Sequence, residues 1–360
     1  MPALKKISLF QFKNYQQQSF DLGAKVTGIC GKNGIGKTNL LDAIYYLCFT
    51  RSYFSRQDGN NVLSGKTGFR IEGEFQNGGE PEKAVCVLRE TGKKEFSING
   101  EAYEKFSHHV GRYTCVVIAP DDAVLVTGGS DERRKFVDAM LCQVDVDYLR
   151  HLITYNKVLL QRNSQLKSFF ETGRQDMELL KVLDDQLTQP GVYIFEKRKI
   201  FLGSFLPLVT HYYADIAGVK ENISTSYESD LLSSSWADLF TANRQKDLHS
   251  MRTNAGVQKD DLVFQFNDQP FKNIASQGQR KSLLFALKLA ETEVLTTEKG
   301  FPPLLLLDDV FEKLDEDRIN NLLKKVCSES NGQVIITDTD EKRFAATMKR
   351  LEIPYQLINL

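Results

Sequence analysis

The chain has 360 residues, of which 41% are hydrophobic and 26% charged, a composition typical of a globular protein with one large or two ordinary domains. No apolar run reaches the about 20 residues that a membrane-spanning helix needs, and the N-terminus lacks a signal-peptide pattern. The 46 basic and 47 acidic residues give a net charge of −1, which neither supports nor excludes nucleic-acid binding. Six scattered cysteines without a CxxC pair predict buried free thiols in a reducing cytoplasm, not disulfides or zinc.

The first third of the chain reads as strands around one helix. Apolar, β-prone runs separated by turn signals such as NGG, TGKK and NG indicate an antiparallel meander. The expected strands are 5–15, 17–22, 25–30, 69–75, 83–90, 95–103 and 114–120.

The segment "GICGKNGIGKTNLL" contains the phosphate-binding loop pattern, from Gly31 to Gly36-Lys37-Thr38. Small residues let successive backbone N–H groups point at the β-phosphate, and the helix that follows adds its positive N-terminal end. Lys37 can reach the β- and γ-phosphates, and the Thr38 hydroxyl can ligate Mg²⁺. The predicted nucleotide-binding residues of this loop are Gly31, Lys32, Asn33, Gly34, Ile35, Gly36, Lys37, Thr38 and Asn39.

The middle of the chain changes character near Ser130. Residues 131–170 and 176–218 have helical periodicity, with Pro190-Gly191 as the only strong break, and they predict a helical hairpin. Two further strands are expected within 222–230 and 261–271. The predicted domains are therefore 1–125, a mostly helical insertion at 126–268, and 269–360.

The last part of the chain carries two more candidate nucleotide elements. Four leucines, 304–307, are followed by Asp308 and Asp309, as expected of a buried parallel strand whose end holds Mg²⁺ and orients the attacking water. Such acidic strand ends also occur by chance, so their meaning depends on the loop at Gly31–Thr38. The strands 332–340 and 353–360 complete this part.

The stretch "SQGQR" at 276–280 opens a strong helix and has two interpretations. Its serine and glycine can offer hydroxyl and backbone donors to the phosphate of another subunit's nucleotide. Alternatively, S-x-x-Q is a capping box that only stabilises the helix start.

Taken in order, these motifs resemble the ABC-type ATPase heads of the SMC class, and within that class the RecF family of bacterial DNA repair and replication proteins. The resemblance spans nearly the whole chain. It is carried by "FKNY", "NGIGKTNLLDAIYYL", "RSYF", "APDDAVLVTGGSDERRKFVD", "YNKVLLQRNSQLK", "ASQGQRKSLLFALKLAE" and "LLLLDDVFEKLD".

The resemblance implies an α/β head of the ABC type, SMC-like, built from both chain ends, with an inserted mostly helical arm or lid domain. It implies ATP and Mg²⁺ as cofactors, an ATP-dependent homodimer, and slow, DNA-stimulated ATP hydrolysis. It also implies binding to double-stranded DNA near single-strand gaps, with RecR and RecO as partners in RecA loading.

The resemblance also assigns roles by motif position. Lys37, Asp308 and Asp309 would be catalytic, with Asp308 and Thr38 at the metal and Asp309 where many ABC-type ATPases have a glutamate. Lys13 would lie near the phosphates. The trans signature would be Ser276, Gly278 and Gln279, with Asp315 as the D-loop aspartate. Transporter ATPases have a switch histidine where this chain has Thr337-Asp338, so Thr337 is the candidate γ-phosphate sensor.

The candidate DNA contacts are basic residues that would meet phosphates without reading sequence, although each also fits an ordinary solvated helix face. They are Arg51, Arg56, Lys197, Arg198 and Lys199, whereas Arg133 and Arg134 could instead be structural and link the head to the arm. Three other classes remain open: a transporter nucleotide-binding subunit, a long-coil SMC protein and a metabolic P-loop kinase. The first would carry SGGQ and a switch histidine, the second sustained heptads, and the third would not need 276–280.

Overall fold

The computed structural model describes residues 2–217, 221–312 and 316–360. The chain forms two compact units. The head unit comprises Met1–Asp122, Asp215–Gly218 and Lys281–Leu360, and the arm unit comprises Ala123–Ala214 and Val219–Arg280. The sequence placed residues 269–280 in the head, whereas here they belong to the arm unit, because Phe271 packs on Tyr213 and Gln279 bonds to Glu221.

A five-stranded parallel sheet of order β14-β3-β13-β12-β8 joins the two ends of the chain in the head unit. β3 comes from the N-terminal part and lies between two C-terminal strands. Four of the strands are buried along their whole length, as expected of a parallel sheet covered on both faces. The strands are β3 (Val26–Cys30), β8 (Cys115–Ile118), β12 (Leu304–Leu307), β13 (Val334–Asp338) and β14 (Gln356–Asn359).

A second, six-stranded sheet of order β2-β1-β4-β5-β6-β7 is antiparallel throughout. β4 pairs with β5 and β5 with β6, so strands that follow one another in the chain are neighbours in the sheet. This confirms the meander predicted from the turn signals. The strands are β1 (Pro2–Phe12), β2 (Tyr15–Asp21), β4 (Phe69–Asn77), β5 (Pro81–Leu88), β6 (Lys94–Ile98) and β7 (Glu101–Ala102).

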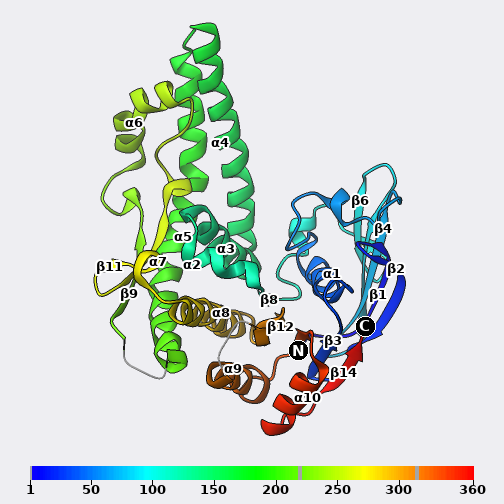
Figure 1. Ribbon diagram of the computed structural model, residues 1–360. Coiled ribbons are helices and arrows are strands. Elements are labelled where there is room, and N and C mark those ends of the chain that lie inside the picture. The colour runs from blue at the N-terminus through cyan, green and yellow to red at the C-terminus, as the bar shows by residue number, and fades with distance from the viewer. Residues whose placement is uncertain (1, 218–220, 313–315) are drawn as a thin grey trace. The chain divides into compact units, whose positions relative to one another are not determined.

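Helix α1 (Lys37–Phe49) contacts both sheets: β1, β4 and β5 of the antiparallel sheet and β8 and β13 of the parallel one (Figure 1). Its buried residues therefore surround the helix instead of forming one stripe. Within its described residues the head unit also contains three longer helices and a π-helical turn at Lys324–Glu329. They are α8 (Gln277–Lys299), whose first turn belongs to the arm unit, α9 (Glu316–Leu323) and α10 (Glu341–Arg350).

The arm unit is built on the antiparallel hairpin of α4 (Val146–Thr172) and α5 (Met177–Ala217), which confirms the helical hairpin predicted from periodicity (Figure 1). Asp145 caps α4 by accepting bonds from the N–H groups of Asp147 and Tyr148. The arm unit also contains α2 (Val124–Thr127), α3 (Ser130–Val144), α6 (Trp236–Ser250), α7 (Phe271–Ile274) and the sheet of β9 (Ile223–Glu228), β10 (Asp261–Phe266) and β11 (Gln269–Pro270).

The predicted break at Pro190-Gly191 is wrong, because α5 continues through both residues. A Cβ atom at Gly191 would lie 2.4 Å from the Trp236 ring and 3.2 Å from the Tyr155 ring. The glycine therefore serves close packing of the indole against the helix backbone, and this contact stabilises a helix that local propensity disfavours.

All six cysteines are buried and none forms a disulfide, as the sequence predicts. Among the residues that the structure describes, no helix is both long and apolar enough to cross a membrane.

Candidate nucleotide site

The glycine-rich loop connects β3 to α1 through backbone conformations that suit glycine. Gly34 has a φ of 80° and Gly36, the residue before α1, a φ of 122°. Lys37 starts the helix, and its Nζ donates to the carbonyl oxygens of Gly31 at 3.0 Å and Lys32 at 3.3 Å. The ammonium group therefore lies along the loop, next to the backbone that a phosphate would approach.

Asp308 links the two ends of the chain at the carboxyl end of β12. The Thr38 hydroxyl donates to its carboxylate, with Oγ1 lying 3.0 and 2.9 Å from the two oxygens, 270 residues away in sequence. Asp308 is only 5% exposed, and burial raises the pKa of its carboxyl, while hydrogen bonds from Thr337 and Thr38 lower it.

The Thr38 hydroxyl and the Asp308 carboxylate form an all-oxygen pair that suits Mg²⁺, which prefers few protein ligands plus phosphate oxygens and water. No group of three or more His, Cys, Asp or Glu side chains that could hold a metal occurs within residues 2–217, 221–312 and 316–360. Two protein oxygens fit a magnesium ion that takes its remaining ligands from water or phosphate.

Thr337, on β13, connects the two acids. Its hydroxyl donates to Asp308 Oδ1 at 2.8 Å and accepts the backbone N–H of Asp309 at 2.9 Å. Asp309 has a φ of 45°, uncommon for a residue other than glycine, and this bond helps to hold it there. Thr337 is fully buried, so the structure gives it a role in placing the acids; its sensor role stays a prediction.

Lys13 forms an ion pair with Asp42 of α1, its Nζ lying 2.5 Å from the buried carboxylate. Asp42 also accepts bonds from the Ser52 hydroxyl at 2.6 Å and the Tyr53 N–H at 2.7 Å. Lys13 is among the predicted site residues but Asp42 is not, because its only signal in the sequence is an acid within an apolar helix.

The signature segment "SQGQR" forms the capping box that the sequence left open. The Gln279 N–H donates to the Ser276 hydroxyl at 3.2 Å, and the Ser276 N–H donates to Gln279 Oε1 at 2.9 Å. Ser276 is exposed, and Ser276, Gly278 and Gln279 belong to the arm unit, whereas the loop and the acids belong to the head unit. Asp315 lies outside the described residues.

Burial removes Arg198 from the candidate DNA contacts, so that prediction is wrong. Its guanidinium is bound by Asp138 at 2.8 Å, Asp260 at 2.8 Å and the Val257 carbonyl at 2.7 Å. It therefore ties α5 to the segment that precedes β10, a role that the run "EKRK" does not reveal.

The other basic candidates differ in solvent exposure and in ion pairing. Arg51, Arg56 and Lys199 are exposed. Lys197 is paired with Asp145 at 2.7 Å, and its side chain is 43% exposed.

Arg133 and Arg134 are structural, as the alternative prediction has it, but the expected link between head and arm is wrong, because their partners lie within the arm unit. Arg133 makes two bonds to Asp261, at 2.7 and 2.9 Å, and Arg134 donates to the Asp260 carbonyl at 2.7 Å. Both arginines therefore hold α3 against the residues around the start of β10, within the arm unit.

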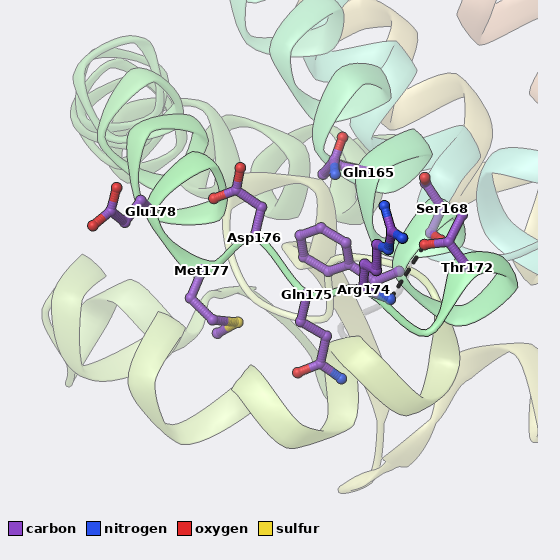
Figure 2. Close-up of a pocket in the computed structure, with 9 residues that line it drawn as sticks. Gln165, Ser168, Thr172, Arg174, Gln175, Asp176, Met177 and Glu178 are labelled. Carbon is purple, nitrogen blue, oxygen red and sulfur yellow. Dashed lines mark hydrogen bonds between the residues drawn. The ribbon is translucent and has the colours of Figure 1, made fainter.

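A separate pocket lies at the turn between α4 and α5 and takes up about 570 Å³ (Figure 2). None of the predicted site residues lines it. Its lining residues are Gln165, Ser168, Phe169, Thr172, Arg174, Gln175, Asp176, Met177 and Glu178.

A phosphate-binding loop, an acidic strand end on a parallel sheet and an adjoining antiparallel sheet define an ATPase head of the ABC type. Residues 3–356 match the family described as the RecF/RecN/SMC N terminal domain. The chain is 42% identical over 357 residues to the DNA replication and repair protein RecF of Flavobacterium johnsoniae, covering 99% of each chain. The chain therefore belongs to the RecF family of DNA replication and repair proteins, within the RecF/RecN/SMC group.

Solved structures agree with this assignment. Two structures of the recombination mediator protein RecF in the RecFOR pathway, RecF-ATPrS and RecF-ATP, give TM-scores of 0.87 and 0.86 at 28% identity. Each similarity covers 94% of this chain, and 93% and 92% of the respective RecF chains. Similarity over this length argues against the transporter-subunit and kinase alternatives.

Proposed function

We propose that the chain binds ATP with Mg²⁺ and hydrolyses it slowly, and that ATP closes a homodimer on double-stranded DNA near single-strand gaps. The observation that carries the proposal is the bond between the Thr38 hydroxyl and Asp308, which brings the loop and the acidic strand end into one site. The RecF-ATP structure supports the choice of nucleotide.

Each residue of the site has a distinct role in this proposal. Backbone N–H groups of the loop and the Lys37 ammonium bind the β- and γ-phosphates. Thr38 and Asp308 would hold Mg²⁺, which would neutralise phosphate charge when bound. Asp309 orients the attacking water and accepts its proton, and Thr337 keeps both acids in place through its two hydrogen bonds.

The dimer follows from the signature segment. In the cap the Ser276 hydroxyl acts as an acceptor, so its proton can still be donated to a γ-phosphate held by a second copy. With Gly278, Gln279 and Asp315, it would complete the partner's site. Because ATP then makes additional contacts in the closed state, it shifts the population toward the dimer instead of supplying force.

DNA would be held through its phosphates by the exposed Arg51, Arg56 and Lys199 and the half-exposed Lys197, without sequence preference. By family membership, RecR with RecO are the proposed partners and RecA the recombinase that is loaded. These partners are extended from the relatives, and the proposed compartment is the cytoplasm.

Light scattering of the full chain with ATP, with ADP and without nucleotide, each with and without duplex DNA, tests the dimer. The wild type should dimerise with ATP, and Ser276→Arg should stay monomeric while still binding ATP. Ser235→Arg is the matched control, because Ser235 caps α6 of the same unit through a 3.2 Å bond from the Asp238 N–H.

The control separates the shared site from the loss of a helix cap, which costs about 1 kcal/mol. If Ser235→Arg also stays monomeric, cap loss explains the result and the composite site is unsupported. A wild type that remains monomeric with ATP and DNA together contradicts the proposal.

A further inference from the structure

The tip of the β1–β2 hairpin lies against the phosphate-binding loop. Phe12 pairs with Tyr15 across the hairpin, so Lys13 and Asn14 form its turn. Lys13 has a φ of 51°, its N–H donates to the Asn61 carbonyl at 2.8 Å, and its ammonium pairs with Asp42. An uncommon backbone conformation anchored on two sides indicates that the position of this turn matters.

Two side chains of the hairpin tip bind consecutive carbonyl groups of the loop. Asn14 Nδ2 donates to the Ile35 carbonyl at 2.7 Å, and the Tyr15 hydroxyl donates to the Gly36 carbonyl at 3.0 Å. Asn14 Oδ1 in turn accepts a bond from Asn39 Nδ2 of α1 at 2.7 Å. The hairpin therefore fixes the loop where it enters the helix.

These bonds determine where the loop's N–H groups point. In a planar trans peptide the C=O and N–H groups point in opposite directions. Holding the carbonyls of Ile35 and Gly36 toward the hairpin therefore turns the N–H groups of Gly36 and Lys37 away from it. N–H groups of such a loop are the donors that a bound phosphate uses.

We infer that Asn14 and Tyr15 are positioning residues that keep the loop in its phosphate-binding conformation before nucleotide arrives. The inference rests on the proposed function, in which this loop binds ATP. Preorganised donors bind more tightly because the ligand does not have to order them.

The packing at Gly36 agrees with this role. A Cβ atom there would lie 2.6 Å from Asn14 Nδ2 and 2.9 Å from the Tyr15 hydroxyl oxygen. Together with the φ of 122°, this leaves room for glycine alone, so the hairpin tip and the loop fit each other directly.

Tyr15 offers a minimal probe. Its side chain is buried and its ring packs edge-on against Phe20, with 5.8 Å between the ring centroids. Tyr15→Phe thus removes the hydroxyl and leaves the packing. The matched control is Tyr113→Phe, since Tyr113 is also buried in the head unit but donates to Glu82, at 2.5 Å.

The test is calorimetric titration of the full chain with ATP and with ADP in the presence of Mg²⁺, alongside thermal unfolding of each variant. Asn14→Leu is close in size and uncharged, and it removes the donor to the Ile35 carbonyl. We expect its Kd for both nucleotides to rise about five- to tenfold, the range of one lost hydrogen bond. Tyr15→Phe should raise them about two- to threefold, because the Leu40 N–H still binds the Gly36 carbonyl.

Positioning predicts equal losses for ATP and ADP, with unfolding midpoints near that of the wild type and an unchanged Kd for Tyr113→Phe. If the variants bind both nucleotides like the wild type, or lower the midpoint with no change in Kd, the inference fails while the proposed function stands. If the wild type binds neither nucleotide, both fail together.

Discussion

Replacing Arg162 with methionine should strongly destabilise the arm unit. Arg162 of α4 is fully buried, and its Nε lies 2.7 Å from Asp184 of α5. Its Nη1 lies 2.8 Å from Asp247 of α6 and 2.9 Å from the Thr253 hydroxyl. The guanidinium also stacks 5.1 Å from the centroid of the Phe240 ring. One side chain therefore holds three helices together.

The magnitude follows from what the substitution leaves behind. Methionine fills similar space, but Asp184 and Asp247 lose a charge partner inside a buried site, a change that costs about 3–5 kcal/mol. Burial is the main cause that raises the pKa of Asp184, and the bond from Arg162 is the first of the causes that lower it. In the variant the pKa of Asp184 should therefore rise further.

The sign of the pH dependence follows from that shift. A carboxyl whose folded pKa is raised favours folding below its unfolded pKa, and this contribution is lost as pH rises through the folded pKa. Each additional pKa unit costs about 1.4 kcal/mol at pH 7. The deficit of Arg162→Met should thus be larger at pH 7 than at pH 5.

The assay uses the single tryptophan of the chain. Trp236 is buried in the arm unit between Tyr155 and Phe240, so its fluorescence during urea unfolding reports that unit. The control is Arg150→Met on the same helix, whose partner Asp147 is 56% exposed and whose loss should cost at most about 0.5 kcal/mol. A deficit under about 1 kcal/mol, or one that grows as the pH falls, refutes the reasoning.

Two further predictions concern buried polar groups of the head unit. Thr337→Val should lower kcat for ATP hydrolysis and destabilise the fold by about 1–3 kcal/mol. Thr337→Ser is the control, because serine keeps both hydrogen bonds. If the valine variant hydrolyses ATP at the wild-type rate, Thr337 does not position the two acids. Glu291 of α8 lies 3.4 Å from Lys288, and burial raises the pKa of its carboxyl to about 7. The stabilisation by this group is therefore present below pH 4.5 and is lost as the pH rises to about 7. In the wild type the free energy of unfolding should fall by up to about 3 kcal/mol over this range for that reason, and Glu291→Gln should remove this fall. An unchanged slope in the variant would contradict the prediction.

Local patterns in the sequence predicted the nucleotide elements well because each is encoded within a few residues. The loop at Gly31–Thr38 and the leucine run before Asp308 are such patterns, and the parallel sheet joins them as expected. The loop and Asp308 come together because of the strand order: β3 pairs with β13, and β13 with β12, so the carboxyl ends of these parallel strands lie at one edge of the sheet.

The sequence was less informative where tertiary contacts override local preference. Pro190-Gly191 reads as a break, but Trp236 packs on the glycine and α5 continues. The helix that carries this tryptophan was missed as well, although Ser235 and Asp238 mark its start. Arg198 looked like a surface cation because its partners, Asp138 and Asp260, lie 60 and 62 residues away in the chain.

Contacts in which one side chain bridges segments far apart in the chain were therefore the hardest to predict from the sequence. Tyr15 shows how much depends on them: its sequence motif suggested a strand, but its hydroxyl reaches the loop carbonyl of Gly36. The same logic applies to Thr337, which meets Asp308 across neighbouring strands. In both cases a hydroxyl group fixes a backbone or carboxylate on which the proposed phosphate chemistry depends. Removing the Tyr15 hydroxyl should therefore affect nucleotide binding more than the fold, and removing the Thr337 hydroxyl should affect both turnover and the fold, whereas removing Arg162 should act mainly on the fold.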